Sequence, residues 1–140
     1  VYGRTDGGEV TEADRADPVE ESGRVVLDAE LLLRARLPAA VVLRFAGIYG
    51  PGRVIRRDAL LRGEPLVGDA DKWLNLVHVD DGVAAVLAAE ARAVPGGTYN
   101  VADGRPVTRR EFYTFLAGRL GAPPAAFKPY PDGATVPVEA

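Results

Sequence analysis

The stretch VVLRFA, residues 41–46, constrains the fold of this chain more than any other. Its apolar residues are nearly continuous rather than alternating, which is typical of a strand buried on both faces of a parallel sheet. We therefore predict a strand over residues 40–46, followed by a glycine-rich exit that includes Gly47 and Gly50. Arg44 lies inside this apolar run, so it needs a partner, and a structural ion pair at the sheet is the simplest one.

A long helix is predicted before this strand, over residues 18–35. Asp17 is a candidate cap, Pro18 suits the first turn, and Pro38 ends the segment. Apolar and small residues recur at spacings of three and four, which predicts one face that packs inward. The members of that face are Val19, Ser22, Val26, Ala29 and Leu33.

Further elements alternate along the rest of the chain. We expect a helix over residues 53–61, a strand over residues 73–79, a helix capped by Asp80, and a strand over residues 98–101. Thr108 and Glu111 have the spacing of a capping box, and Gly121 is a candidate helix end. In that last helix the predicted core residues are Phe112, Phe115 and Leu116.

Alternating strands and helices predict an α/β fold with a mainly parallel sheet. The composition, 140 residues with 47% hydrophobic and 26% charged, fits one globular domain. A net charge of −3 without a basic stripe argues against nucleic acid. The chain has no cysteine, one histidine and no membrane-length apolar run, so we expect no metal site, no membrane contact and a cytoplasmic location. It also contains no methionine, so we expect a piece of a longer protein.

The order and spacing of five motifs resemble the NAD-dependent epimerase/dehydratase family of the extended short-chain dehydrogenases/reductases. The motifs are VYG at residues 1–3, Glu30 in the long helix, LRFAGIYGPG at residues 43–52, LVHVDD at residues 76–81 and TYNVADGRPVTRREF at residues 98–112. The resemblance implies the C-terminal part of a Rossmann-like doubly wound sheet with the small substrate-binding subdomain. It covers residues 1–122, and residues 123–140 are expected to form a proline-rich tail.

The resemblance also implies a function. The parent protein would be an NAD- or NADP-dependent oxidoreductase acting on a nucleotide-sugar or a similar hydroxyl or carbonyl compound. Ala46, Gly47 and Ile48 would contact the cofactor, and Arg53 would contact the substrate. The isolated chain is not expected to bind NAD or NADP, because the phosphate cradle would lie in the other half. The long helix corresponds to one that often pairs across a homodimer interface in the family.

Two departures from the family pattern affect the chemistry. The family's catalytic Tyr-x-x-x-Lys positions fall on Ser22 and Val26, counted back from Glu30, and neither side chain performs that proton transfer. The arginine that meets a diphosphate in sugar-nucleotide enzymes is replaced by Leu74, followed by Asn75. We therefore assign no catalytic residue.

Tyr2 and Tyr49 are the nearest alternative phenols, with Arg24 or Lys72 as cations, although no spacing supports such a pair. We expect both tyrosines to pack with a hydrogen-bonded hydroxyl. Three interpretations stay open: half of an active oxidoreductase, an atypical cofactor-binding protein that acts as a sensor or scaffold, and an unrelated interaction domain.

Overall fold

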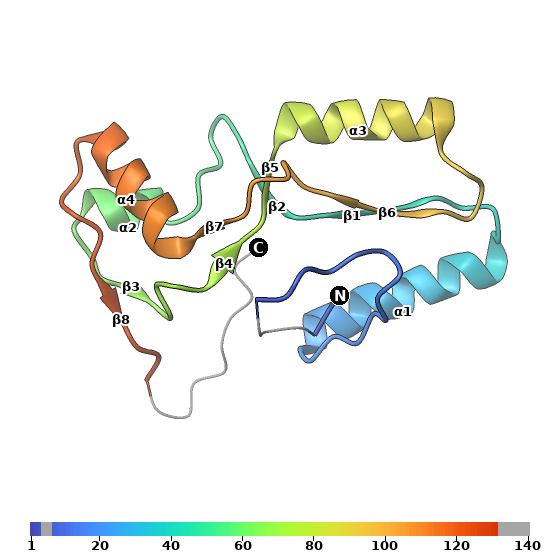
Figure 1. Cartoon of the computed structure of the whole chain (residues 1–140), viewed down its shortest axis with the longest axis horizontal. Helices are drawn as coiled ribbons and strands as arrows, with labels where there is room; N and C mark the ends of the chain where they lie inside the picture. The colour runs from blue at the N-terminus through green and yellow to red at the C-terminus, as the bar shows by residue number, and fades with distance from the viewer. Residues whose placement is uncertain (4–6, 132–140) are drawn as a thin grey trace. The chain divides into compact units, whose positions relative to one another are not determined.

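A computed structural model gives the fold of residues 1–3 and 7–131 of the chain, which divides into two compact units. Unit 1 comprises Val1–Phe45 and Asp81–Val101, and unit 2 comprises Ala46–Asp80 and Ala102–Ala140 (Figure 1). Each unit is therefore built from two segments that are distant in the sequence.

Unit 1 is a parallel pair of strands between two helices. Strand β1 (Val42–Phe45) pairs with β6 (Thr98–Val101) in parallel. Helix α1 (Glu21–Arg36) and helix α3 (Val79–Arg92) run along opposite faces of this pair (Figure 1). Neighbouring residues of β1 face opposite ways, so Arg44 bonds to Glu30 of α1 while the Phe45 ring abuts Gly82 of α3. The predicted α/β class with parallel strands is confirmed.

Helix α1 exists, but two details of its prediction are wrong. It begins at Glu21, its N-cap is Glu20 without a side-chain bond, and Asp17 does not cap it. The predicted inward face is displaced by one residue, because Val26 is 51% exposed and no residue of α1 is fully buried. The half-buried residues at helical spacing are instead Gly23, Leu27, Glu30 and Arg34.

Unit 2 contains three short strand pairs. Strand β2 (Gly47–Tyr49) pairs with β5 (Leu76–His78) in parallel, β3 (Leu66–Val67) pairs with β8 (Phe127–Lys128) in parallel, and β4 (Trp73–Leu74) pairs with β7 (Val107–Thr108) antiparallel. The strand predicted over residues 73–79 is thus divided at Asn75. Its carbonyl accepts the Gly47 N–H at 3.0 Å, at the point where the chain passes from one partner strand to another.

Two helices complete unit 2, α2 (Arg57–Leu61) and α4 (Arg109–Leu120). The capping box is confirmed, since Thr108 accepts from the Glu111 N–H and the Glu111 carboxylate accepts from the Thr108 N–H. Gly121 ends α4 with a left-handed φ of 63°, as predicted. The prediction for Phe115 is wrong, because this ring is 69% exposed. The buried cluster consists of Leu60, Leu66, Leu74, Leu76, Tyr113 and Ala117.

Two helix starts differ from prediction. Helix α2 begins at Arg57 rather than near residue 53, after Arg56 adopts a left-handed φ of 58°. Helix α3 begins at Val79, so Asp80 lies in its first turn instead of capping it. At this helix start the Asp80 N–H donates to His78 Nδ1 at 3.2 Å.

Of the described residues after α4, Phe127–Lys128 form β8, which pairs with β3 of unit 2. The rest of the predicted tail, residues 132–140, lies outside the described residues. Within the part of the chain that the structure describes, none of the helices has the length and hydropathy needed to cross a membrane.

Candidate functional site

A polar network centred on Arg44 holds the elements of unit 1 together. The guanidinium donates to both carboxylate oxygens of Glu30, with the shortest contact at 2.7 Å, and the side chains of this pair are 15% and 11% exposed. Arg44 Nη1 also donates to the Tyr2 hydroxyl at 2.6 Å, and Tyr2 donates to Asn100 Oδ1 at 3.0 Å. The hydrogen bond to Glu30 raises the pKa of Arg44. The predicted structural ion pair of Arg44 is confirmed, and its partner is Glu30.

The network also bears on the two alternative phenols. The Tyr2 hydroxyl is hydrogen-bonded, as expected, but its cation is Arg44, while Arg24 donates to the carbonyl of Val19. The Tyr49 ring lies edge-on to His78, with centroids 5.3 Å apart, and packs against the core of unit 2. Tyr2 is therefore accounted for by hydrogen bonding and Tyr49 by packing, each within its own unit.

The two positions that carry the family's Tyr and Lys lie on the exposed part of α1. Ser22 is exposed in its first turn, and Val26 follows one turn later with 51% of its surface exposed. Neither side chain has a group that titrates near neutral pH. The described part of unit 1 thus offers no proton-transfer pair at these positions.

The predicted cofactor contacts, Ala46, Gly47 and Ile48, are half-buried at the start of unit 2. Gly47 and Ile48 belong to β2 and face Leu76 and Val77 of β5, so they form a strand rather than a turn. Their contact with a cofactor stays a prediction.

Arg53, the predicted substrate contact, is exposed and closes a tight turn. Its backbone exchanges two hydrogen bonds of 3.0 Å with Gly50, and its Nε donates to the carbonyl of Ile48 at 3.2 Å. A role toward substrate stays a prediction for this residue.

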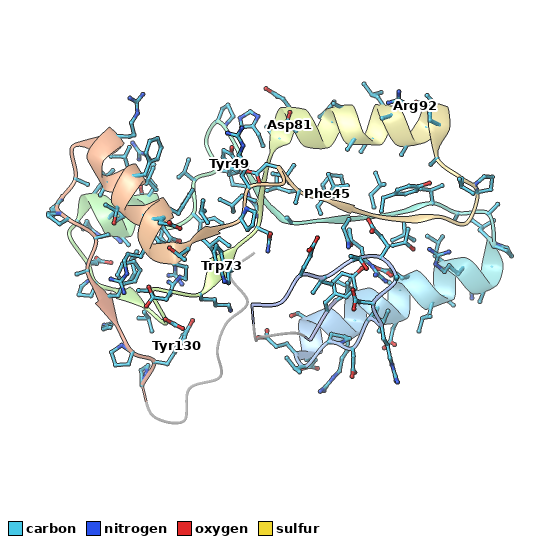
Figure 2. The ribbon with its side chains drawn as sticks, viewed as in Figure 1. Phe45, Tyr49, Trp73, Asp81, Arg92 and Tyr130 are labelled. Carbon is cyan, nitrogen blue, oxygen red and sulfur yellow. The ribbon has the colours of Figure 1, made fainter. Side chains whose placement is uncertain are left out.

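Unit 2 contains a cavity of about 80 Å³ beside β4 and β5. Gly47, one of the predicted cofactor contacts, lines it, together with Lys72 and Asn75. Trp73 on β4 and Tyr130 on the C-terminal segment line it as well (Figure 2). The cavity is the feature of unit 2 that brings a predicted site residue together with polar and aromatic side chains.

Arg109 also lines this cavity, and sequence reasoning missed it. The residue is 1% exposed, donates to the carbonyls of Val67 and Asp69 at 2.9 Å, and lies over the rings of Tyr113 and Phe127. It is the first residue of α4, directly after the N-cap Thr108. No sequence signal distinguishes it from the neighbouring Arg110, which is exposed.

The replacement of the diphosphate arginine is visible at the same cavity. Leu74 is 9% exposed and belongs to the core cluster, so its position supplies packing rather than charge. Among the residues with a described placement, no group of three His, Cys, Asp or Glu side chains could hold a metal ion.

The chain is similar in fold to solved enzymes. It superposes on a double mutant of DesIV, the dTDP-glucose 4,6-dehydratase of Streptomyces venezuelae with NAD and DAU bound, with a TM-score of 0.80 and 26% identity. The alignment covers 96% of this chain and 46% of the dehydratase. The fold therefore defines the chain as part of a Rossmann-type dehydratase or epimerase domain.

Curated proteins of similar sequence cover most of the chain. Protein YeeZ of Escherichia coli K12 is 35% identical over 130 residues, which are 91% of this chain and 46% of YeeZ. A 3-diazoavenalumate denitrifying reductase from Streptomyces is 36% identical over 108 residues, 72% of this chain and 35% of the reductase. No family model matches the chain.

The chain belongs to the NAD-dependent epimerase/dehydratase family of the short-chain dehydrogenases/reductases. It corresponds to the C-terminal half of these proteins and spans 46% of the length of YeeZ.

Proposed function

We propose that the chain is the substrate-side half of an NAD(P)-dependent oxidoreductase of the epimerase/dehydratase type. The observation that carries this proposal is its similarity over 91% of its length to relatives about twice as long. In this proposal unit 2 binds a small-molecule substrate, and the other half of the parent protein binds the dinucleotide. The cytoplasmic location stays a prediction.

The residues at the start of unit 2 fit the nicotinamide end of the cofactor. Gly47 has no side chain and lines the cavity, so a flat ring could approach its backbone closely. The Gly47 N–H already donates to Asn75, which leaves shape rather than a hydrogen bond as its contribution. When bound, the cofactor supplies hydride transfer, and Ala46, Gly47 and Ile48 would border it.

A second candidate is an atypical member that binds the cofactor without the usual proton transfer. Ser22 and Val26 favour it, because the family's tyrosine and lysine are both missing and Tyr2 is engaged with Arg44 and Asn100. This protein would act as a sensor or scaffold.

Dinucleotide titrations on the complete gene product and on the 140 residues alone test both candidates. The complete gene product should bind NADH or NADPH at micromolar concentrations, and the 140 residues alone should not. Substrate-dependent oxidation of the bound cofactor supports the oxidoreductase, whereas tight binding without turnover supports the sensor. Micromolar dinucleotide binding by the 140 residues alone would contradict the proposed division of labour.

We further propose that α1 forms a homodimer contact. Its apolar residues Val25, Val26, Ala29, Leu32 and Leu33 recur at helical spacing and form one exposed stripe. Val25 is 63% exposed and Leu32 is 54% exposed. Ala29, at the middle of the stripe, is small enough to let a second copy of the helix approach closely in an antiparallel pair.

Light scattering of the complete protein tests this contact with a matched pair of variants. Leu32→Glu places a charge in the stripe and should produce a monomer. Leu31→Glu changes a similarly exposed leucine on the other flank of α1 and should leave the dimer intact. A monomeric wild-type protein, or equal behaviour of the two variants, would exclude this interface.

A further inference from the structure

The cavity in unit 2 has a volume and a lining that bear on the charge and size of the ligand it could take. We propose that it takes a small, planar monoanion, such as an aryl or enoyl carboxylate, rather than a nucleoside diphosphate. The inference rests on the proposed function, because it names the substrate class of that same site. It depends on three properties of the cavity: its volume, the charge of its lining and its aromatic surfaces.

The volume limits the ligand to a small group. The cavity measures about 80 Å³, whereas pockets that enclose drug-sized ligands measure roughly 300–1,000 Å³. A nucleoside diphosphate could place only a fragment there. A single ring or a short conjugated chain matches the space better.

The charge of the lining favours one negative group. Lys72 and Arg109 contribute positive charges, and among the described residues that line the cavity none is Asp or Glu. Arg109 is directed at the carbonyls of Val67 and Asp69, which fix its guanidinium in place. Lys72, by contrast, is exposed and extends from the turn before β4, so it is the cation that can move to meet a carboxylate.

The two cations at the cavity also argue against a diphosphate ligand. Tight diphosphate binding uses bidentate arginines. Among the described residues that line the cavity the arginine is Arg109, and it donates to the carbonyls of Val67 and Asp69 instead. Lys72 offers a single point charge. The cavity therefore provides for one anionic group and not for two phosphates in series.

The aromatic surfaces favour a planar ligand. Trp73 is 49% exposed and lines the cavity, and Tyr130 lines it from the C-terminal segment (Figure 2). Gly68 lets Tyr130 come close to Arg109, because an added Cβ there would lie 2.7 Å from both the Tyr130 hydroxyl and Arg109 Nη1. Ile55 adds an apolar wall. A conjugated or aromatic carboxylate can thus pack against rings while its charge meets Lys72.

Trp73 is the sole tryptophan of the 140 residues, so its fluorescence reports ligand binding at the cavity directly. The experiment titrates the 140-residue chain with benzoate, with benzamide as the uncharged counterpart of the same shape, and with inorganic pyrophosphate. We expect a saturable change with benzoate at millimolar concentrations and about fivefold weaker binding of benzamide. Pyrophosphate should not compete with benzoate.

Two lysine variants identify the charge that matters. Lys72→Gln should weaken benzoate binding about fivefold and leave benzamide binding unchanged. Lys128→Gln, which changes a lysine outside the cavity, is the matched control and should bind benzoate like the unchanged chain. A fall in benzamide affinity as well would indicate that the substitution disturbs the fold of the cavity rather than its charge, and would contradict the assigned role of Lys72.

Three results would overturn the inference: no saturable change with benzoate, equal benzoate affinity of the unchanged chain and the Lys72→Gln variant, or pyrophosphate binding more tightly than benzoate. These outcomes are separate from the fate of the proposed function. Benzoate binding that depends on Lys72 supports the ligand class even if the complete protein binds no dinucleotide. Dinucleotide turnover without benzoate binding preserves the oxidoreductase and removes the ligand class.

Discussion

The two units of this chain bury apolar surface very differently. Unit 2 assembles the cluster Leu60, Leu66, Leu74, Leu76, Tyr113 and Ala117, all of them nearly inaccessible. Unit 1 contributes Val42 to the buried hydrophobic side chains, and most of the exposed large apolar residues belong to it, on α1 and α3. Its described contacts are instead polar, centred on Arg44 and Glu30.

This difference bears on how each unit is stabilised. Burial of a large side chain contributes about 1.5–3 kcal/mol, so unit 2 has a conventional source of stability in its cluster. Two-stranded sheets are marginal in water unless another layer covers them. Helices α1 and α3 cover the pair β1 and β6, but α1 has no fully buried residue and α3 has Gly82 alone, so this cover buries little apolar surface. We infer that unit 2 maintains its own fold, whereas unit 1 depends on surfaces outside these 140 residues. The exposed stripe on α1 fits that dependence, as does the fact that the chain spans 46% of the length of YeeZ.

The largest effect should come from the core of unit 2. Leu60→Ala removes a side chain that is 2% exposed, so we expect a loss of about 2–4 kcal/mol in the free energy of unfolding. Urea unfolding followed by Trp73 fluorescence measures it. Leu61→Ala on the same helix is the control, because Leu61 is 41% exposed and should lose less than about 1 kcal/mol.

A leucine-to-alanine substitution in α1 tests whether unit 1 has an apolar core. In the 140-residue chain alone, Leu32→Ala on α1 changes a residue that is 54% exposed, and we expect a change in the free energy of unfolding within about 0.5 kcal/mol. Hydrogen exchange of the α1 amides measures it. A loss comparable to that of Leu60→Ala would show that unit 1 has an apolar core of its own.

The next effect concerns the ion pair of unit 1. Glu30→Gln leaves the largely buried guanidinium of Arg44 without its carboxylate, so we expect a loss of about 2 kcal/mol, between the values for exposed and fully buried pairs. Hydrogen exchange of the β1 and β6 amides should accelerate about 30-fold. Glu90→Gln, on the exposed side of α3, is the control. Unchanged hydrogen exchange in the Glu30→Gln variant would show that the Arg44–Glu30 pair contributes no more stability than an exposed ion pair.

A smaller effect is expected at the capping box of α4. Thr108→Ala removes the acceptor of the Glu111 N–H, and the loss of such a cap costs about 1 kcal/mol. Thr108→Ser retains the hydroxyl and should behave like the unchanged chain. Thermal unfolding of the three proteins distinguishes these cases, and an equal loss in both variants would assign the effect to the Thr108 methyl group instead of the cap.

The sequence predicted those features that depend on neighbouring residues. The capping box and the αL glycine after it are confirmed because their bonds join residues at most a few positions apart. The strands predicted over residues 40–46 and 98–101 correspond to β1 and β6, although their pairing was not predicted and β1 is largely half-buried rather than buried on both faces. The resemblance that named the family likewise used ordered local motifs.

Features that depend on distant contacts were not predictable. Periodicity located α1 but selected a face one residue away from the true one, because Glu30 and Arg34 are polar and yet face inward. Glu30 bonds to Arg44, and Arg34 donates to the carbonyl of Gly96 and to Thr98 Oγ1, all contacts that need the folded chain. The burial of Arg109 was missed for the same reason, since its carbonyl partners lie about 40 positions earlier.

The smallest expected effect is the pH dependence of stability that arises from two carboxylates, one in each unit. Glu111 in unit 2 accepts the Thr108 N–H at 2.7 Å, and Glu12 in unit 1 accepts the Asn100 N–H at 2.6 Å. These backbone hydrogen bonds lower the pKa of both carboxyl groups. A carboxyl whose pKa is lower in the folded state stabilises the fold above its unfolded pKa, and this contribution is lost as the pH falls through the folded pKa.

We therefore expect both units to lose some stability below about pH 4. Titration of the two carboxyl carbons by NMR measures the pKa values, and both should lie below that of an ordinary glutamate. Glu111→Gln keeps an acceptor for Thr108 but cannot titrate, so it should reduce the acid loss in unit 2 while leaving that of unit 1 unchanged. The rest of the acid loss in unit 2 comes from groups such as Glu64 and Asp71, whose pKa values are lowered by Arg62 and Arg110. Because the Glu12 bond joins positions 88 residues apart, it forms only when unit 1 is folded. The titration can also give an ordinary pKa for Glu12 together with a lowered pKa for Glu111. That result would mean that, in the absence of surfaces outside these 140 residues, unit 1 is unfolded while unit 2 is folded.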